Sequence, residues 1–333
     1  MLWRLSYRPE AMHKPKSLPI PFFRALSLAA PLLLAASLPL AAAPRAAPFT
    51  VAETGRSYVK LADAVEAIGG GTGTIRIAPG RYRDCAVQEA GRVAYVAERR
   101  GTAVFDGGIC EGKATLVLRG RSARVEGLVF THTRVADGNG AGIRIEKGDL
   151  NVSWSRFVDA QCGIISAIDP AGTIVIDRST FSLLGKHPDG RGAHSLYVGG
   201  YGALQVTNSR FERGTGGHYV KSRAPKADLL DNSFDDSGGR NTNYMIDLPN
   251  GATGRIAGNT FLQGNDKDNF GTFIAVRAEA KVHPSAGLVI ENNQAMLVPA
   301  FRGPTAFVGD WSGERLVIRG NRLARGIKLF ERH

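Results

Sequence analysis

The stretch Val206-Thr207-Asn208-Ser209-Arg210-Phe211 is the clearest copy of a pattern that recurs along most of the 333-residue chain. In each copy, alternating apolar and polar residues lead into one or two polar residues, and most copies end on Phe. Six copies end in this way at intervals of 23 to 30 residues, and two weaker copies follow at residues 290–293 and 318–323. The six endings are Phe130, Phe157, Phe181, Phe211, Phe234 and Phe261.

A repeat of this length matches one coil made of two or three short strands joined by turns. A single coil cannot bury its own apolar face, whereas coils stacked about 4.8 Å apart align like side chains and close a continuous core. Asn suits the turns of such a stack because its amide can bond to the Asn above and below. The pattern predicts an all-β, right-handed parallel β-helix over residues 50–330, the hand following from the strong preference of parallel crossovers.

The beginning of this region predicts a short helix. Leu61, Ala64, Val65 and Ile68 recur at helical spacing, and three glycines at 69–71 end the segment. A helix here would cap the first coil, whose edge and core are otherwise open.

The N-terminus has the order of a secretory signal. Residues 1–24 hold five basic residues and one acid, an Ala/Leu-rich run covers 25–43, and Ala41 and Ala43 supply the small residues of a cleavage site. We predict a signal peptide over residues 1–43 and a periplasmic or secreted protein. The alternative is an uncleaved membrane anchor, but Pro31 and Pro39 disfavour it, so no stable membrane span is expected after cleavage.

The charge of the chain favours an anionic partner. The net charge is +12, and removing residues 1–43 leaves it near +8. Such a protein suits an acidic polysaccharide, an envelope surface or a nucleic acid. No basic run is interleaved with stacking aromatics, so nucleic acid is the weakest of the three.

A second short strand precedes most of the Phe positions by about 12 to 15 residues. Because side chains alternate across a strand, inward Ile145, Val198, Val220 and Ile246 would place their neighbours on the outer face. That face is rich in aromatic and charged groups, as a sugar-binding groove would be. The predicted outward residues include Arg144, Tyr197, Tyr219, Lys221, Arg223, Asp247 and Arg277.

Four segments, residues 139–144, 194–199, 217–223 and 246–251, resemble bacterial right-handed parallel β-helix proteins of the pectin-lyase-like superfamily. With the opening segment, the resemblance covers about residues 50–330. It implies the fold but no single reaction, since that superfamily includes lyases, hydrolases, epimerases and proteins with no known reaction.

The chain can be compared residue by residue with two enzyme families of this superfamily. Val220-Lys221-Ser222 is similar to the strand that carries the catalytic lysine of alginate-type β-helix lyases. Those families place an arginine in register on the next coil, where this chain has Asp247, and the nearest arginine expected in that row is Arg277. The Asp-Pro-His-Asp motif of mannuronan epimerases is absent, because Asp169-Pro170 lacks the following His and Asp.

β-Elimination on a uronate requires a base near C5 and cations that neutralise the carboxylate. In this hypothesis Lys221 is the base, with neighbouring cations and burial lowering its pKa. Arg223 and Arg144 clamp the carboxylate, and His194 or Tyr197 protonates the leaving oxygen. Further contacts would come from His218, Tyr219 and Arg277.

Each of these residues also has a structural interpretation. Lys221 and Asp247 would form an ion pair one strand spacing apart, which would keep Lys221 charged. His194 and His218 would be satisfied polar residues at coil corners. Tyr197 and Tyr219 would stack on each other between coils.

Two other functions are compatible with the same residues. Asp247 would be the acid of a glycoside hydrolase if Asp235 or Asp236 supplied a second carboxylate roughly 5–9.5 Å away. Alternatively, the protein would bind carbohydrate at the cell envelope without a reaction.

The remaining candidates concern calcium and cysteine. The oxygen-rich loop 263–269 could hold calcium but lacks an EF-hand pattern, so a solvated turn is preferred and no cofactor or metal is assigned. Cys85 and Cys110 lie about one coil apart and are predicted to form a disulfide between neighbouring coils, leaving Cys162 as a buried thiol.

Overall fold

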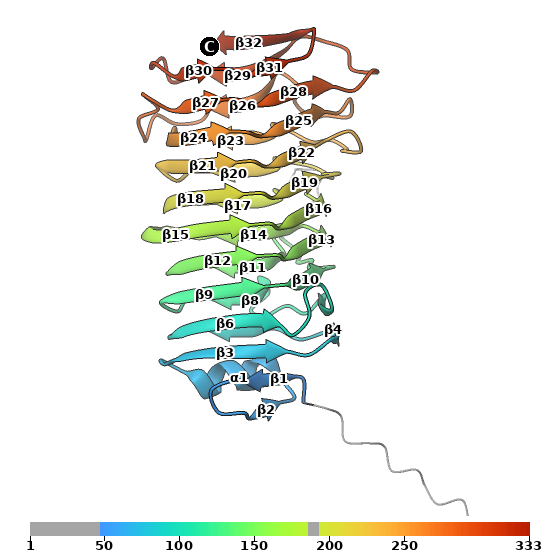
Figure 1. Cartoon of the computed structure of the whole chain (residues 1–333), viewed down its shortest axis with the longest axis vertical. Helices are drawn as coiled ribbons and strands as arrows, with labels where there is room; N and C mark the ends of the chain where they lie inside the picture. Colours follow the sequence, from blue (N-terminus) through green and yellow to red (C-terminus); the bar gives the residue numbers. More distant parts are fainter. Residues whose placement is uncertain (1–46, 186–192) are drawn as a thin grey trace, which may run out of the picture. The chain divides into compact units, whose positions relative to one another are not determined.

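The computed structural model describes residues 47–185 and 193–333. The predicted signal peptide and the loop at 186–192 lie outside these described residues. The described chain forms a parallel β-solenoid with one short helix at its N-terminal end (Figure 1). This confirms the predicted coil and cap; the right-handed sense of the coil stays an expectation.

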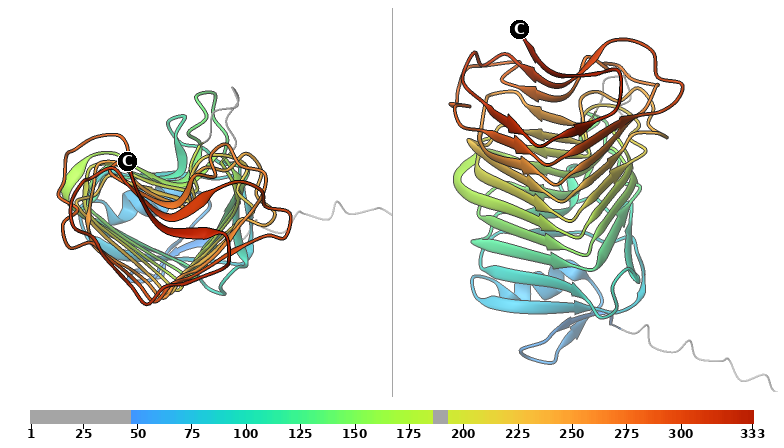
Figure 2. Two further views of the ribbon diagram at one scale, coloured as in Figure 1. Left: turned by 90° about the horizontal axis from the view of Figure 1, so that it is seen from above. Right: turned by 45° about the horizontal axis from the view of Figure 1, so that its top comes forward.

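Each coil contributes one strand to each of three sheets, and the strands of successive coils pair in parallel. The coils overlie one another when the solenoid is seen from above (Figure 2). The first sheet contains β2 (Ser57–Tyr58), β1 (Phe49–Val51), β3 (Thr72–Ile77), β6 (Arg92–Ala97), β9 (Ser122–Glu126), β12 (Asp149–Ser153), β15 (Asp169–Asp177), β18 (Tyr201–Thr207), β21 (Lys226–Leu230), β24 (Thr253–Ala257), β27 (Val289–Glu291) and β30 (Val317–Arg319).

The second and third sheets each have ten strands. The second contains β4 (Gly80–Tyr82), β7 (Ala103–Asp106), β10 (Leu128–Thr131), β13 (Arg156–Ala160), β16 (Thr180–Leu184), β19 (Arg210–Glu212), β22 (Ser233–Asp235), β25 (Thr260–Gln263), β28 (Gln294–Leu297) and β31 (Arg322–Leu323). The third contains β5 (Ala86–Gln88), β8 (Ala114–Leu118), β11 (Ala141–Ile145), β14 (Cys162–Ser166), β17 (Leu196–Val198), β20 (Val220–Ser222), β23 (Ile246–Leu248), β26 (Thr272–Val276), β29 (Thr305–Asp310) and β32 (Ile327–Arg332).

The recurring Phe forms a ladder inside the second sheet. Phe130 pairs in register with Phe157, and the same register continues through Phe261. Neighbouring rings from Phe105 to Phe261 are stacked with centroids 4.7 to 5.7 Å apart. The repeated residue therefore sets the register of the coils by packing like on like.

The turn between the first and second sheets carries the predicted Asn stack over four coils. Asn232, Asn259 and Asn293 are buried, and each uses its side-chain amide to bond the Asn of the next coil. The side-chain oxygens of Asn259, Asn293 and Asn321 each also accept the backbone N–H of the Asn on the preceding coil. The stack satisfies buried backbone groups that the tight turn would otherwise leave without partners.

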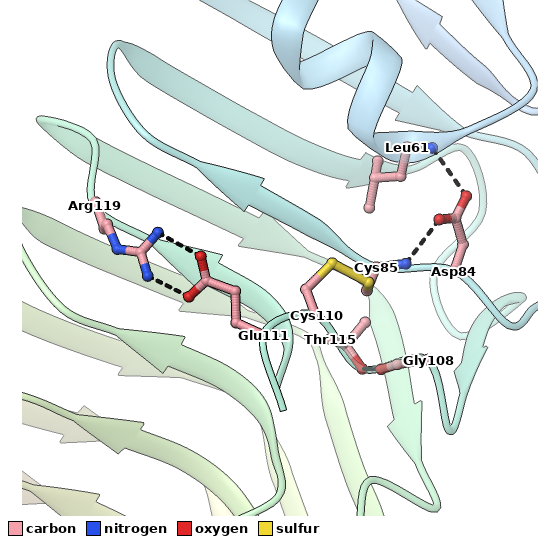
Figure 3. The surroundings of a disulfide bond; sticks show 8 residues. All are labelled: Leu61, Asp84, Cys85, Gly108, Cys110, Glu111, Thr115 and Arg119. Atoms are coloured by element: carbon pink, nitrogen blue, oxygen red, sulfur yellow. Dashed lines mark hydrogen bonds and ion pairs between the residues drawn. A yellow bond between two sulfur atoms is a disulfide. The ribbon is translucent and has the colours of Figure 1, made fainter. Parts of the chain in front are cut away.

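Helix α1 (Leu61–Ile68) covers the first coil with buried Leu61, Ala64 and Val65. The Leu61 N–H donates to Asp84 Oδ2 at 2.9 Å. Directly after Asp84, Cys85 forms the predicted disulfide with Cys110, with 5.6 Å between the two Cα atoms (Figure 3). The hydrogen bond of Asp84 thus links the helix to the first coil, and the disulfide links the first coil to the second. Cys162 is free and buried, as predicted.

In the third sheet the register differs from the sequence interpretation at more than one pair of strands. Val220 pairs with Leu196 and Ile246, not with Val198, which pairs with Ser222. Independently of this shift, the residue before β20 turns into the core instead of facing outward. Tyr219 is 1 % exposed and donates from its hydroxyl to Asp236 Oδ1 at 2.7 Å, so its predicted place on the outer face is wrong.

A search for transmembrane helices finds no candidate among residues 47–185 and 193–333.

Candidate functional site

The outward row of the third sheet brings Tyr197, Lys221 and Asp247 onto three consecutive strands. Tyr197 is opposite Lys221, and Lys221 is opposite Asp247. Side chains at directly opposed positions on neighbouring strands are about 5 Å apart at Cβ, so the three groups form one cluster. The predicted pairing of Lys221 with Asp247 is observed, whereas Tyr197, which was predicted on the same face but opposite Tyr219, lies opposite Lys221.

Lys221 lies between two carboxylates. Its Nζ is 3.0 Å from Asp247 Oδ2 and also donates to Glu279 Oε1. Burial alone would lower the pKa of Lys221, whose side chain is 9 % exposed, but the Asp247 charge and the two hydrogen bonds outweigh burial and raise the pKa above its ordinary value. Lys221 therefore carries its proton at neutral pH, as the ion-pair interpretation requires, and it is suited to hold an anion.

Asp247 is the most buried member of the cluster, at 3 % side-chain exposure. Burial raises the pKa of Asp247, and the Lys221 charge offsets only part of that rise. Its Oδ2 is also 3.2 Å from His218 Nε2, while Oδ1 has no hydrogen-bond partner among the described residues. Asp247 thus serves to hold Lys221 and His218 in place.

The rings of His194, His218 and Tyr244 lie beside this row, each two residues before the first residue of β17, β20 or β23. His218 stacks on His194 with centroids 4.9 Å apart, and on Tyr244 at 5.6 Å. Burial and the nearby Lys221 charge lower the pKa of His194 to about 3, and burial also lowers the pKa of His218 well below its ordinary value. The His218 backbone N–H donates to His194 Nδ1 at 3.1 Å, so the neutral His194 carries its proton on Nε2 and is a donor.

These depressed pKa values predict a loss of stability in mild acid. Below pH 6.5 His194 and His218 become protonated in the unfolded chain but stay neutral in the folded chain. The free energy of unfolding therefore falls as the pH drops toward 3. Between pH 6.5 and 5 the loss is at most about 2 kcal/mol per histidine. Urea unfolding across this range should show a shallower pH dependence for His194→Asn; an unchanged slope would contradict the assignment.

Arg223 follows β20 and uses all three guanidinium nitrogens. Nε donates to the Tyr197 hydroxyl oxygen at 3.1 Å, Nη1 to Asn250 Oδ1 at 2.6 Å and Nη2 to Glu279 Oε2 at 2.5 Å. Because Tyr197 accepts in this bond, its own phenolic proton is left for another acceptor. Arg223 therefore orients Tyr197 and presents a cation beside it.

A cleft of about 550 Å³ opens next to Arg223 and is large enough for a small-molecule ligand. Tyr197 and Arg223 form its edge toward Lys221, and apolar side chains form much of the rest. Other lining residues include Ile168, Tyr201, Asn250, Val282 and His283.

Three predicted binding residues lie apart from this cluster. Arg277 is not in the Lys221 row, where Ala275 stands, and it pairs with Glu314 at 2.8 Å. Arg144 shares the row but lies three strands from Lys221, about 14 Å at one strand spacing each, and its Nε is 3.5 Å from Glu146. Tyr219 is in the core. A further shift of two residues, between β23 and β26, accounts for the error at Arg277, because Ile246 pairs with Ile274 and not with Val276.

The two candidate hydrolase partners of Asp247 are also held elsewhere. Asp236 is buried inside the coil, where it accepts from Tyr219 and from Lys267 Nζ at 3.0 Å. Asp235 pairs with Arg210 on the second sheet. The loop 263–269, considered for calcium, places the ammonium of Lys267 in the interior, and no group of three metal-ligating side chains occurs among the described residues.

The sequence interpretation missed Glu279, Asn250, Tyr244 and His283. Asn250 was within a segment of the resemblance, but nothing marked its side chain as a partner of Arg223. Glu279 lies 56 residues from Arg223, on a loop that carries no repeat signal. His283 Nε2 is 3.2 Å from the Arg223 carbonyl oxygen. Long-range contacts of this kind become visible only once the coils are in register.

The comparisons with known proteins find similarity at the level of solved structures. No protein-family model and no curated protein matches the chain. Among solved structures, an alginate lyase from Paenibacillus sp. str. FPU-7 is similar, with 14% identity, a TM-score of 0.46 and coverage of 81% of this chain and 95% of that chain.

Proposed function

We propose that this chain is an exported protein that binds a uronate-containing polysaccharide and cleaves it by β-elimination. The observation that carries the proposal is that Tyr197 lies opposite Lys221 and accepts a hydrogen bond from Arg223, in a cleft that Tyr197 and Arg223 line. Cations paired with a phenol supply the two requirements of the reaction, which are neutralisation of a carboxylate and transfer of a proton.

The roles differ from those assigned from the sequence alone. Lys221 and Arg223 hold the carboxylate of the sugar and stabilise the negative charge that develops when the C5 proton leaves. Tyr197 acts as a phenolate, after its own proton has passed to solvent, and takes the C5 proton; the C4=C5 double bond forms, and the C4–O4 bond breaks. The Tyr197 hydroxyl then returns that proton to the leaving oxygen, which restores the phenolate, while the neutral His194 keeps its Nε2 proton. Asp247 keeps Lys221 in position and takes no part in proton transfer.

The reaction is tested on a panel of polyuronates, with neutral dextran as the control. The expected result is a rise in ultraviolet absorbance from the C4–C5 unsaturated product on at least one polyuronate, and no change on dextran. The Lys221→Gln variant should raise KM by roughly tenfold or more, since a charged contact to the carboxylate is lost. New reducing ends without the absorbance would instead indicate a hydrolase.

A second function is favoured by one specific observation. Lys221 is held by two carboxylates, an arrangement that also suits a protein that only binds its ligand. In that case the protein would be retained on immobilised polyuronate, and neither the unsaturated product nor new reducing ends would form.

A further inference from the structure

Glu279 connects the two cations of the site with its two oxygens. Oε1 accepts from Lys221 Nζ, and Oε2 accepts from Arg223 Nη2 at 2.5 Å. Burial alone would raise the pKa of Glu279, but these hydrogen bonds lower it below its ordinary value, so the group is a carboxylate at neutral pH. A carboxylate bound at two points by cations is also how a uronate would bind here.

The three side chains differ in their access to solvent. The Glu279 side chain is 44 % exposed, whereas Arg223 is 27 % and Lys221 is 9 % exposed. Glu279 therefore reaches the cations from the solvent side, and it can return to water by a change of rotamer. The cost of that change is modest, because partly exposed ion pairs contribute little net stability.

The backbone around Glu279 is held without its side chain. The N–H groups of Glu279 and Ala280 each donate to the Pro249 carbonyl oxygen at 3.0 Å, and the N–H of His283 donates to Asn250 at 2.9 Å. The loop would stay in place if the carboxylate turned away. The contact is therefore a movable side chain on a fixed backbone.

The rest of the cation pair is also independent of Glu279. Arg223 keeps Tyr197 and Asn250 as partners, and Lys221 keeps Asp247. Without Glu279, the cations Lys221 and Arg223 would have only the Asp247 carboxylate beside them, so one positive charge of the cluster would not be neutralised. A site that is oriented in advance and short of one anion binds a carboxylate from solution.

From these contacts we propose that Glu279 is an internal substitute for the carboxylate of the ligand, which must displace it to bind. This inference rests on the proposed function, because it concerns the same site and names a sugar carboxylate as the displacing group. Glu279 competes at the effective concentration of a tethered group, and this lowers the apparent affinity for the external ligand. The Glu279→Gln variant should bind polyuronate roughly tenfold more tightly than the wild type, and dextran no better.

The closing experiment measures the melting temperature of the full protein with free D-glucuronate, and with D-glucose as the neutral control. Glu279→Ala should melt only slightly below the wild type, and millimolar glucuronate should raise the melting temperature of this variant. The wild type should respond little at the same concentration, because its own carboxylate fills the site. The matched control is Glu291→Ala, which removes a carboxylate that bridges two exposed arginines, Arg255 and Arg319. Glucuronate should raise the melting temperature of this control less than that of Glu279→Ala.

Equal responses of the wild type and Glu279→Ala to glucuronate, or no response of either, would overturn the inference. Glu279→Gln, which keeps the shape of the side chain, replaces Glu279→Ala if the latter fails to fold. The proposed reaction is judged separately. A glucuronate response without any unsaturated product would leave a carboxylate site and reject the lyase, whereas product formation with unresponsive Glu279 variants would reject only this inference.

Discussion

Tyr197→Phe is expected to lower kcat on a polyuronate by about 10²- to 10⁴-fold while leaving binding of the polymer nearly unchanged. The substitution removes one oxygen, which is the atom that accepts from Arg223 Nε and is placed to exchange a proton with the sugar. The ring remains at the edge of the cleft, so stacking on the sugar persists. The measurement is initial-rate kinetics by product absorbance, combined with retention on immobilised polyuronate.

Tyr244→Phe is the matched control for this prediction. Its hydroxyl accepts from Asn269 Nδ2 at 2.8 Å and has no contact with Arg223, so its loss should change kcat less than fivefold or so. Full activity of Tyr197→Phe would exclude Tyr197 as the proton-transfer group. An equal loss in both variants would point to a disturbed fold instead of a lost catalytic group.

Asn259→Ala is expected to lower the free energy of unfolding by about 3 to 5 kcal/mol. The buried Asn259 amide donates to the Leu229 carbonyl oxygen and to Asn293, and its oxygen accepts from both the backbone and the side chain of Asn232. Alanine leaves these partners without a bond in a place that is closed to water. Chemical denaturation followed by circular dichroism measures the change.

Asn321→Ala is the comparison for the ladder. Asn321 is the last of the four and only half-buried, so water can replace the bonds it makes to Asn293 and Ile290. A loss of about 1 kcal/mol is expected there. Similar losses of unfolding free energy in Asn259→Ala and Asn321→Ala would show that burial does not determine how much each Asn contributes to stability.

Residues that recur once in each coil were predictable, because the length of the repeat determines which side chains lie next to each other on neighbouring coils. The Phe and Asn ladders, the helix over Leu61–Ile68 and the Cys85–Cys110 disulfide follow from spacing alone. Lys221 and Asp247 also meet as expected, since both lie within regular strands of neighbouring coils.

Tyr219 and Glu279 were not predictable in this way, for two physical reasons. Strand alternation distinguishes the faces only within a strand, and Tyr219 lies one residue before β20, where the chain bends into the core. A shift of two residues keeps the same faces, so alternation could not tell Val198 from Leu196 as the neighbour of Val220. Glu279 lies on a loop, and its place depends on bonds to Pro249.

In the proposed reaction Lys221 and Arg223 hold the carboxylate of the sugar while Tyr197 transfers the proton, and the product of the reaction tests this proposal most directly. Mass spectrometry of oligomers released from a polyuronate by the wild-type protein should find chains whose new non-reducing end lacks one water and carries the C4=C5 double bond. These chains should be absent after treatment with Tyr197→Phe. Saturated fragments that have gained a water at the cleaved bond, or unchanged polymer throughout, would contradict the account.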